Sequence, residues 1–163
     1  EMLNIAIKNK PNFVCLVPEK RKEITTEGGL NLKSNKSNLF KIIKSLNKNK
    51  IRTSLFINPT KHDILASKNL DIKCVELHTG KISNLIKNKK NFSIELKKIK
   101  KCAKIANDLG LEVHAGHGMD YKTAKILSKV PHIKEFNIGH FIVGESFFYG
   151  FRSTIKKFRK ILK

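Results

Sequence analysis

The sequence predicts an α/β fold of parallel strands and helices, arranged as about the last five βα units of a (β/α)8 TIM barrel. Five short apolar runs of strand length alternate with segments whose apolar residues recur at helical spacing. No hairpin turn signal or internal repeat interrupts this order. A complete barrel needs about 250 residues, so residues 1–163 are expected to form a single incomplete barrel domain. A doubly wound open sheet with five strands is the alternative.

The N-terminal region predicts the end of a helix, a strand and a long loop. Apolar residues within 1–10 are followed by lysine, and Pro11 stops the helix. Residues 12–17 are a continuous apolar run, which has the length of a buried strand. Residues 18–30 contain Thr25 and a glycine pair, which are typical of a loop.

The middle of the chain repeats the alternation of helix and strand. Residues 37–48 have apolar side chains at helical spacing and predict a helix, and residues 51–57 predict the second strand. A short helix at about 60–68 and a third strand at 71–77 follow. Residues 81–91 are rich in lysine and asparagine and are expected to be an exposed loop or the start of a helix.

The C-terminal half has the clearest amphipathic pattern, because apolar side chains line one face of residues 92–109 before Gly110. The next short helix closes before Pro131, and phenylalanines at helical spacing mark the last one. The elements expected after the amphipathic helix are a strand at 111–115, a helix at 121–129, a strand at 135–138 and a helix from about 142 to 162.

Composition narrows the function classes. The net charge is +21 at pH 7, which is typical of proteins that bind nucleic acid, and a basic RNA-binding domain is therefore one alternative. However, the positive residues are almost all lysine, only four arginines occur, and tryptophan is absent. Arginine and aromatic side chains make most base contacts, so a solvated lysine-rich surface is favoured. Three cysteines without metal-like spacing fit a reducing cytoplasm.

Two glycine–histidine elements follow the fourth and fifth expected strands. Gly116-His117-Gly118 precedes a helix, so a phosphate could approach its backbone N–H groups while the imidazole transfers a proton. Gly139-His140 ends the last strand just before the last helix. In a barrel, the loops after the last two strands and an adjacent helix N-terminus form the usual phosphate site. Tight turns with incidental histidines are the alternative.

Further polar residues occur at the ends of earlier strands. Glu76 and His78 alternate along the third strand, so both face the same side and are expected to point into the barrel mouth. An unpaired buried carboxylate is costly, so Glu76 is expected to balance a positive charge on a substrate or to pair with a lysine. Thr25 and its neighbouring glycines could contact phosphate or sugar hydroxyls. A metal site formed by Glu76 with histidines is a less favoured possibility, because no diagnostic ligand spacing is present.

Five motifs, in order, resemble those of the pyridoxine 5′-phosphate synthase family across essentially the whole chain. The motifs are Leu-Val-Pro-Glu-Lys-Arg-Lys-Glu-Ile-Thr-Thr-Glu-Gly-Gly-Leu at 16–30, Ser-Leu-Phe-Ile at 54–57, Glu-Leu-His-Thr-Gly at 76–80, His-Ala-Gly-His-Gly at 114–118 with Tyr121, and Glu-Phe-Asn-Ile-Gly-His at 135–140. The resemblance implies a TIM barrel that joins 1-deoxy-D-xylulose 5-phosphate to 3-amino-2-oxopropyl phosphate. It implies no metal or organic cofactor and a homo-oligomer, typically an octamer. From composition, no nucleic-acid partner is expected, and no membrane partner is expected because no run of about 18 apolar residues occurs.

The resemblance also implies roles for individual residues. Thr25 contacts the deoxyxylulose phosphate, Glu76 assists the charged intermediates, and His117 is the proton donor. The residues implied to hold the aminooxopropyl phosphate are Gly118, Gly139 and His140.

The chain departs from the family pattern in three respects. Asn58 stands where the family commonly has Asp, and Glu145 stands where a basic residue is common. The family's N-terminal third, with two of its three acid–base residues, has no counterpart in this sequence. We therefore expect these residues to be the C-terminal portion of the enzyme. The alternative is a truncated, inactive relic of it.

Overall fold

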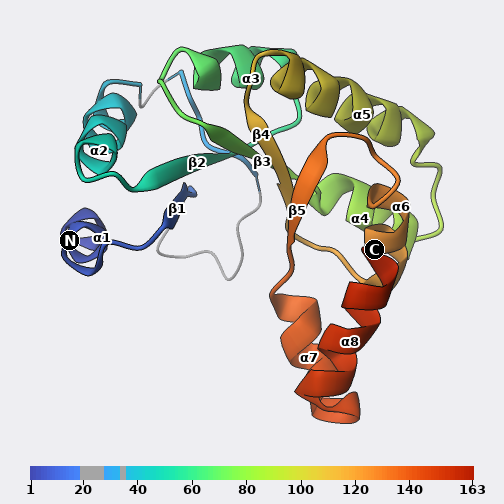
Figure 1. Cartoon of the computed structure of the whole chain (residues 1–163). Coiled ribbons are helices and arrows are strands. Elements are labelled where there is room, and N and C mark those ends of the chain that lie inside the picture. The colour runs from blue at the N-terminus through green and yellow to red at the C-terminus, as the bar shows by residue number, and fades with distance from the viewer. Residues whose placement is uncertain (19–27, 34–35) are drawn as a thin grey trace.

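The structure is a computed structural model that describes residues 1–18, 28–33 and 36–163 (Figure 1). In this part of the chain, strands and helices alternate as the sequence predicts. The strands are β1 (Phe13–Leu16), β2 (Arg52–Ile57), β3 (Cys74–His78), β4 (Glu112–Gly116) and β5 (Ile133–Asn137). The helices are α1 (Met2–Asn9), α2 (Lys36–Lys48), α3 (Lys61–Lys68), α4 (Gly80–Lys87), α5 (Ser93–Asp108), α6 (Tyr121–Leu127), α7 (His140–Tyr149) and α8 (Phe151–Ile161).

The sheet has the strand order of a barrel. Its five strands follow one another as β1-β2-β3-β4-β5, and each pairs in parallel with the next. A doubly wound sheet would reverse its strand order at a switch point, and no reversal occurs among these strands. The chain therefore forms an arc of a (β/α)8 barrel, and the alternative of an open doubly wound sheet is wrong.

The two faces of the sheet differ in chemistry because side chains alternate along each strand. The outward side chains are apolar and pack against the helices, whereas the inward side chains on β2–β5 are largely polar. Leu55, Ile57, Val75, Leu77 and Val113 of the strands share one buried cluster with Ile43, Ile64, Ile82, Ile99 and Leu127 of the helices and helix ends. The core thus lies between sheet and helices, which leaves the inner face free for polar groups.

The structure refines one sequence-based expectation and corrects another. Of the two possibilities expected for 81–91, an exposed loop or the start of a helix, most of the segment forms α4, because Ile82 and Ile86 lie one turn apart and both are buried in the core. The single helix expected over 142–162 is two helices. Gly150 separates them with φ 76° and ψ 147°, a conformation that no α-helix contains. The sequence does not reveal this break in the helix, because the aromatic pattern continues on both sides of Gly150.

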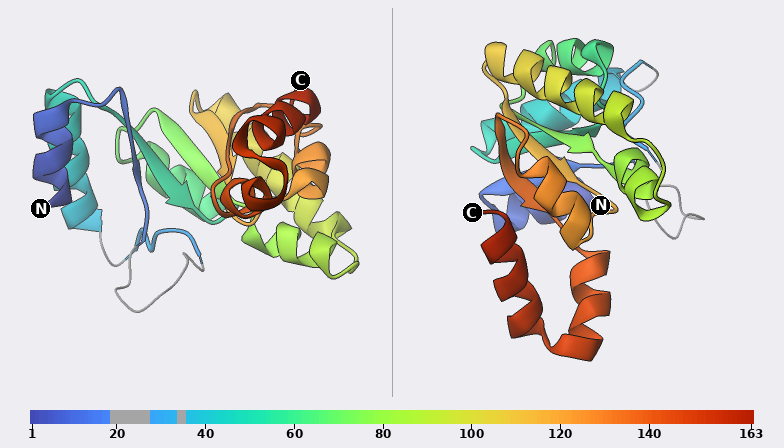
Figure 2. Two further views of the ribbon diagram at one scale, coloured as in Figure 1. Left: turned by 90° about the horizontal axis from the view of Figure 1, so that it is seen from below. Right: turned by 90° about the vertical axis from the view of Figure 1, so that its right-hand side faces the viewer.

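Helices α7 and α8 form an antiparallel pair that extends away from the sheet beside β5 (Figures 1 and 2). The side chains of Phe147, Phe148, Tyr149 and Phe151, around the turn between the two helices, are 62–85% exposed. None of the helices in the described residues combines the length and apolar character needed to cross a bilayer.

Candidate active site

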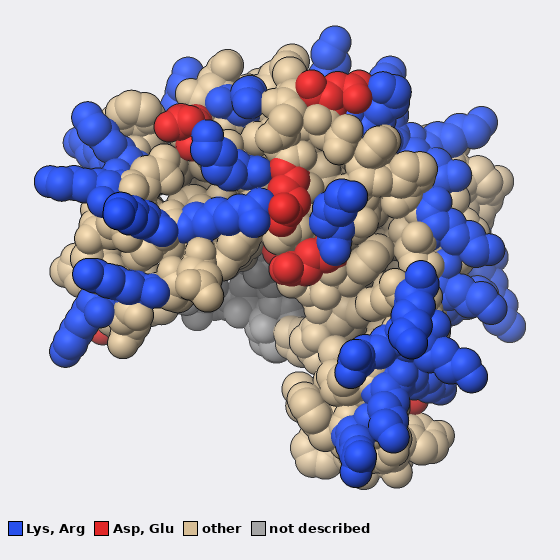
Figure 3. All heavy atoms as spheres, in the orientation of Figure 1, with Lys and Arg blue, Asp and Glu red and all other residues tan. Residues whose placement is uncertain are grey.

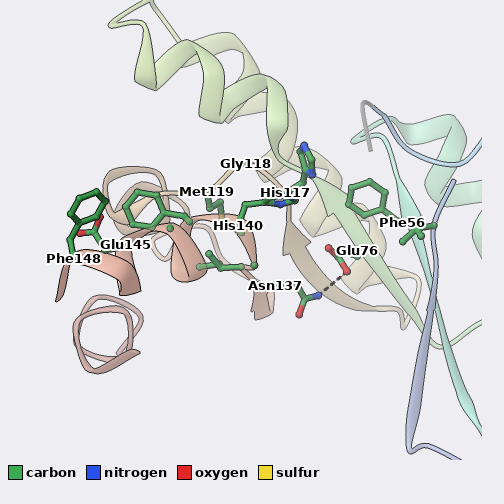
Figure 4. Close-up of a pocket in the computed structure, with 14 residues that line it drawn as sticks. Phe56, Glu76, His117, Gly118, Met119, Asn137, His140, Glu145 and Phe148 are labelled. Carbon is green, nitrogen blue, oxygen red and sulfur yellow. Dashed lines mark hydrogen bonds between the residues drawn. The ribbon is translucent and has the colours of Figure 1, made fainter. Parts of the chain in front are cut away.

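A cavity of about 740 Å³ opens at the carboxyl ends of the strands (Figure 4). Its lining comes from every strand end and from α7. The lining residues are Val17, Phe56, Glu76, His117, Gly118, Met119, Asn137, Ile138, Gly139, His140, Phe141, Gly144, Glu145 and Phe148. Because parallel strands all end at the same edge of a barrel, motifs far apart in the sequence meet here.

Glu76 lies on the inner face of β3 and is 8% exposed. Its Oε2 accepts a hydrogen bond of 2.7 Å from Nδ2 of Asn137 on β5 (Figure 4) and one of 3.5 Å from the thiol of Cys15 on β1. Burial raises the pKa of the Glu76 carboxyl, and the two hydrogen bonds oppose this by stabilising the charged form. The arrangement holds a carboxylate whose proton affinity is higher than usual at the base of the cavity.

Backbone space keeps Glu76 in this position. A β-carbon added to Gly116 on the neighbouring strand would overlap Oε1 of Glu76, and it would lie 3.3 Å from Cβ of Asn137. Glycine at the end of β4 therefore gives the carboxylate its room. The glycine is visible in the sequence, but the reason for it is not. Glu76 pairs with His114 on the neighbouring strand, and this register brings the Glu76 side chain beside Gly116, two residues further along β4.

His117 follows β4 and faces the cavity. Its ring stacks on the ring of His78 with 5.0 Å between centroids, and Phe56 contacts both rings edge-on. Burial lowers the pKa of His117, and the nearby His140 lowers it further. Burial, with His117 next to it, lowers the pKa of His78 to about 4. At neutral pH both imidazoles are therefore largely neutral.

The N-terminus of α7 closes the cavity on the β5 side. Gly139 is the N-cap residue of α7, and no side chain caps this end of the helix. A β-carbon added to Gly139 would meet no atom within 4 Å, so the space beside it is open. Uncapped N–H groups at a helix N-terminus attract anions, so this end of the cavity suits a phosphate. His140 in the first turn and Glu145 in the next also line the cavity, so a negative charge lies near the same region.

The structure brings together five of the six residues selected from the sequence: Glu76, His117, Gly118, Gly139 and His140. Thr25 lies outside the described residues. His78 shares the inner face with Glu76, as expected, but it packs behind His117 instead of lining the cavity. Sequence reasoning missed Asn137, although it is a polar residue at an inward position of a strand end. Asn58 accepts a hydrogen bond from the N–H of Gly29 at 3.0 Å.

A second polar cluster lies deeper inside the barrel. Among the described residues, Cys74, Glu112 and His114 have ligand atoms within 4.8 Å of one another, which is a spacing that a metal ion could use. However, both oxygens of Glu112 already have partners, because Oε1 contacts His114 and Oε2 contacts Arg52, each at 2.8 Å. Burial raises the pKa of the Cys74 thiol to about 12, so the thiol is protonated. Glu112 is thus already engaged by Arg52 and His114, and Nδ1 of His114 in turn lies 3.3 Å from Oε1 of Glu135.

The sheet topology and the cavity define a TIM-barrel protein with a buried carboxylate, imidazoles and a helix N-terminus without a side-chain cap at the carboxyl ends of its strands. The family model described as "Pyridoxal phosphate biosynthesis protein PdxJ" matches residues 1–163. The chain belongs to this family.

Curated relatives agree with this assignment. The chain is 60% identical over 161 residues to pyridoxine 5′-phosphate synthase of Pelagibacter ubique, covering 99% of this chain and 67% of the relative. It is 43% identical over 162 residues to the synthase of Zymomonas mobilis, covering 99% of this chain and 62% of the relative. The chain therefore spans about two thirds of the length of these relatives.

The structure is similar to that of 3-keto-L-gulonate-6-phosphate decarboxylase from Vibrio cholerae. The TM-score is 0.65 at 13% sequence identity, with 99% of this chain and 65% of the other covered. At this identity the likeness concerns the fold alone.

Proposed function

We propose that the protein containing these residues is a pyridoxine 5′-phosphate synthase. It condenses 3-amino-2-oxopropyl phosphate with 1-deoxy-D-xylulose 5-phosphate and releases pyridoxine 5′-phosphate, phosphate and water. The observation that supports this most directly is that Glu76 and His117, from neighbouring strands, line one cavity with the N-terminus of α7. A carboxylate, an imidazole and an anion site at one barrel face suit proton transfer on a phosphorylated substrate.

Each residue has a role that follows from its place. His117 donates a proton to the reacting substrate, and Glu76 stabilises the positively charged intermediates from the neighbouring strand. Gly118, Gly139 and His140 hold the phosphate of 3-amino-2-oxopropyl phosphate. The family resemblance assigns Thr25, which lies outside the described residues, to contact with 1-deoxy-D-xylulose 5-phosphate. These roles match those that the family resemblance implies.

The proposed protein works as a homo-oligomer. The exposed aromatic side chains at the turn between α7 and α8 support this, because large apolar groups clustered on a surface mark contact sites. An RNA-binding role has only the net charge of +21 in its favour. On the face shown in Figure 3, basic side chains are spread over several helices instead of following one stripe, and acidic side chains gather near the centre.

The test is an assay of the full-length protein with both substrates. The wild type is expected to form pyridoxine 5′-phosphate, and His117→Ala is expected to lower turnover by about 10²-fold or more, the usual scale for a general acid. His62→Ala is a matched control, because His62 is exposed on α3 and its ring contacts the neighbouring Asp63. No product from the folded wild type would favour the inactive relic, and unchanged turnover in His117→Ala would remove His117 from the reaction.

A further inference from the structure

The backbone at His117 has a conformation that needs external support. Its φ is 82°, and Gly118 follows with φ 73°. Non-glycine residues adopt positive φ infrequently, and when they do so at a functional site the surrounding structure fixes them. A group outside this loop is therefore expected to hold the backbone of His117 in place.

Thr79, in the turn between β3 and α4, makes the contacts that do so. Its hydroxyl lies 2.7 Å from the carbonyl oxygen of Gly116 and 2.6 Å from that of His117, and its N–H donates to the same Gly116 oxygen at 2.8 Å. The single hydroxyl proton is thus shared between two consecutive carbonyls. These bonds join the two βα turns on either side of the imidazole.

Thr79 is itself fixed. It is fully buried, and its carbonyl oxygen accepts hydrogen bonds from the N–H and the hydroxyl of Ser83 at 3.0 and 2.8 Å. Ser83 lies one turn into α4, whose neighbouring residues Ile82 and Ile86 are buried in the core. The position of the His117 backbone is therefore tied to a helix of the scaffold and not only to its own loop.

Gly80, the residue after Thr79, also helps to position His117. A β-carbon on Gly80 would lie 2.8 Å from the ring of His78 and 3.0 Å from Cδ2 of His117. The bare glycine lets the two stacked rings approach the turn. The hydroxyl thus fixes the backbone of His117, and the glycine leaves space for its ring.

We propose that Thr79 is a positioning residue for His117, acting through hydrogen bonds from its hydroxyl to the carbonyls of residues 116 and 117. This inference rests on the proposed role of His117 as proton donor. Thr79 does not line the cavity, so it acts on the reaction only through the orientation of the imidazole. Misplacement of a reacting group by about 1 Å costs on the order of 10²-fold in rate.

The test compares Thr79→Val, which keeps the shape but loses the hydroxyl, with Thr79→Ser, which keeps the hydroxyl, in the full-length protein. Thr79→Val is expected to lower kcat by about 10- to 10²-fold with KM within about threefold. Thr79→Ser is expected to keep kcat within about threefold of the wild type. A purely structural role would lower the midpoint of thermal unfolding in both variants without this kcat difference.

A second measurement separates this inference from the proposed function. The proton resonances of the His117 ring are followed by NMR through a pH titration, which requires no catalysis. Thr79→Val is expected to shift the ring resonances and the pKa of His117, while Thr79→Ser leaves them close to those of the wild type. If the Thr79→Val spectrum and titration match the wild type, the positioning role is wrong even where the enzyme is active. If the shift occurs but no protein variant forms product, the proposed reaction is wrong and the positioning role stands.

Discussion

Asn137 donates a hydrogen bond of 2.7 Å to the Glu76 carboxylate, although the two residues are 61 positions apart in the chain. The bond spans the inner face of the barrel from β5 to β3, with β4 between them. Because the carboxylate is buried, it depends on such donors to keep its charge. Asn137 thereby controls how readily Glu76 binds a proton.

Substitution of Asn137 by alanine is expected to raise the pKa of Glu76 further, since a hydrogen bond that stabilises the charged form is lost. If ionised Glu76 is needed, the acidic limb of the pH–rate profile moves to higher pH. The limb is expected to move by about one to two pH units, the scale of a hydrogen bond to a charged group. Asn107→Ala on the exposed face of α5 is the control. An unshifted acidic limb in Asn137→Ala would contradict the dependence of Glu76 on this donor.

Gly116→Ala tests the space beside the carboxylate. The added β-carbon would overlap Oε1 of Glu76, so either the side chain or the strand must move. Such overpacking costs about 1–3 kcal/mol in the free energy of unfolding. Gly144→Ala in α7 is the matched comparison, because nothing lies within 4 Å of its added carbon. That variant is expected to gain up to about 1 kcal/mol from better helix propensity.

Urea unfolding of both variants measures these changes. A Gly116→Ala protein as stable as the wild type would mean that Glu76 moves aside without cost. In that case its carboxylate is not tightly held, and the role assigned to Asn137 weakens with it.

A third prediction concerns the protonation of His117. Burial and the neighbouring His140 lower its pKa below the ordinary value of 6.5, so the ring is largely neutral at pH 7. The imidazolium is the stronger proton donor, and a bound phosphate supplies the negative charge that favours it. Inorganic phosphate is therefore expected to raise the pKa of His117.

NMR titration of the His117 ring with and without inorganic phosphate measures this shift. His62, which is exposed on α3, serves as the internal control and should not respond to phosphate beyond the effect of ionic strength. If phosphate binds and the His117 pKa stays the same, the anion does not lie near this ring. The phosphate site assigned to the N-terminus of α7 would then be wrong.

Much of this arrangement was accessible from the sequence. Strand-length apolar runs that alternate with helical patterns predicted the parallel sheet, and polar residues at strand ends predicted a site that joins Glu76, His117 and His140. These signals are local, because they depend on spacing and on the end of each strand. The helix break at Gly150 was not predicted, since the aromatic pattern continues through it.

Contacts between distant segments account for what the sequence does not reveal. Asn137 gains its role only when β5 lies two strands from β3, and Thr79 only when the β3–α4 turn meets the loop after β4. Both residues belong to motifs found in the sequence, at 76–80 and 135–140, but neither motif reveals which distant group its residue contacts. Likewise, His78 and Glu76 are two residues apart on β3 and face the same side of the sheet. However, the His78 ring packs against His117 and Phe56 and does not line the cavity.

The last prediction concerns stability and pH, and it depends on His78. Its pKa is lowered from 6.5 to about 4 in the folded protein, so between these values the unfolded chain binds a proton that the folded state does not. The unfolded state is therefore favoured as the pH falls through this window. The contribution is absent above about pH 7, where His78 is neutral in both states. Replacement by phenylalanine, which keeps an aromatic ring against His117, removes the proton and should remove this part of the acid sensitivity.

Urea unfolding at pH 7 and pH 5 measures the effect in wild type and His78→Phe. The wild type is expected to lose more free energy of unfolding between these pH values than the variant does. Glu76 acts in the opposite direction, because its raised pKa favours the folded state as the pH falls. The effect of His78 is therefore measured by the difference between the two proteins, since Glu76 contributes to the pH dependence of both. Equal losses in both proteins would show that His78 is protonated as easily when folded as when unfolded. Its ring would then be accessible to water, and the stacked arrangement with His117 would not persist in solution.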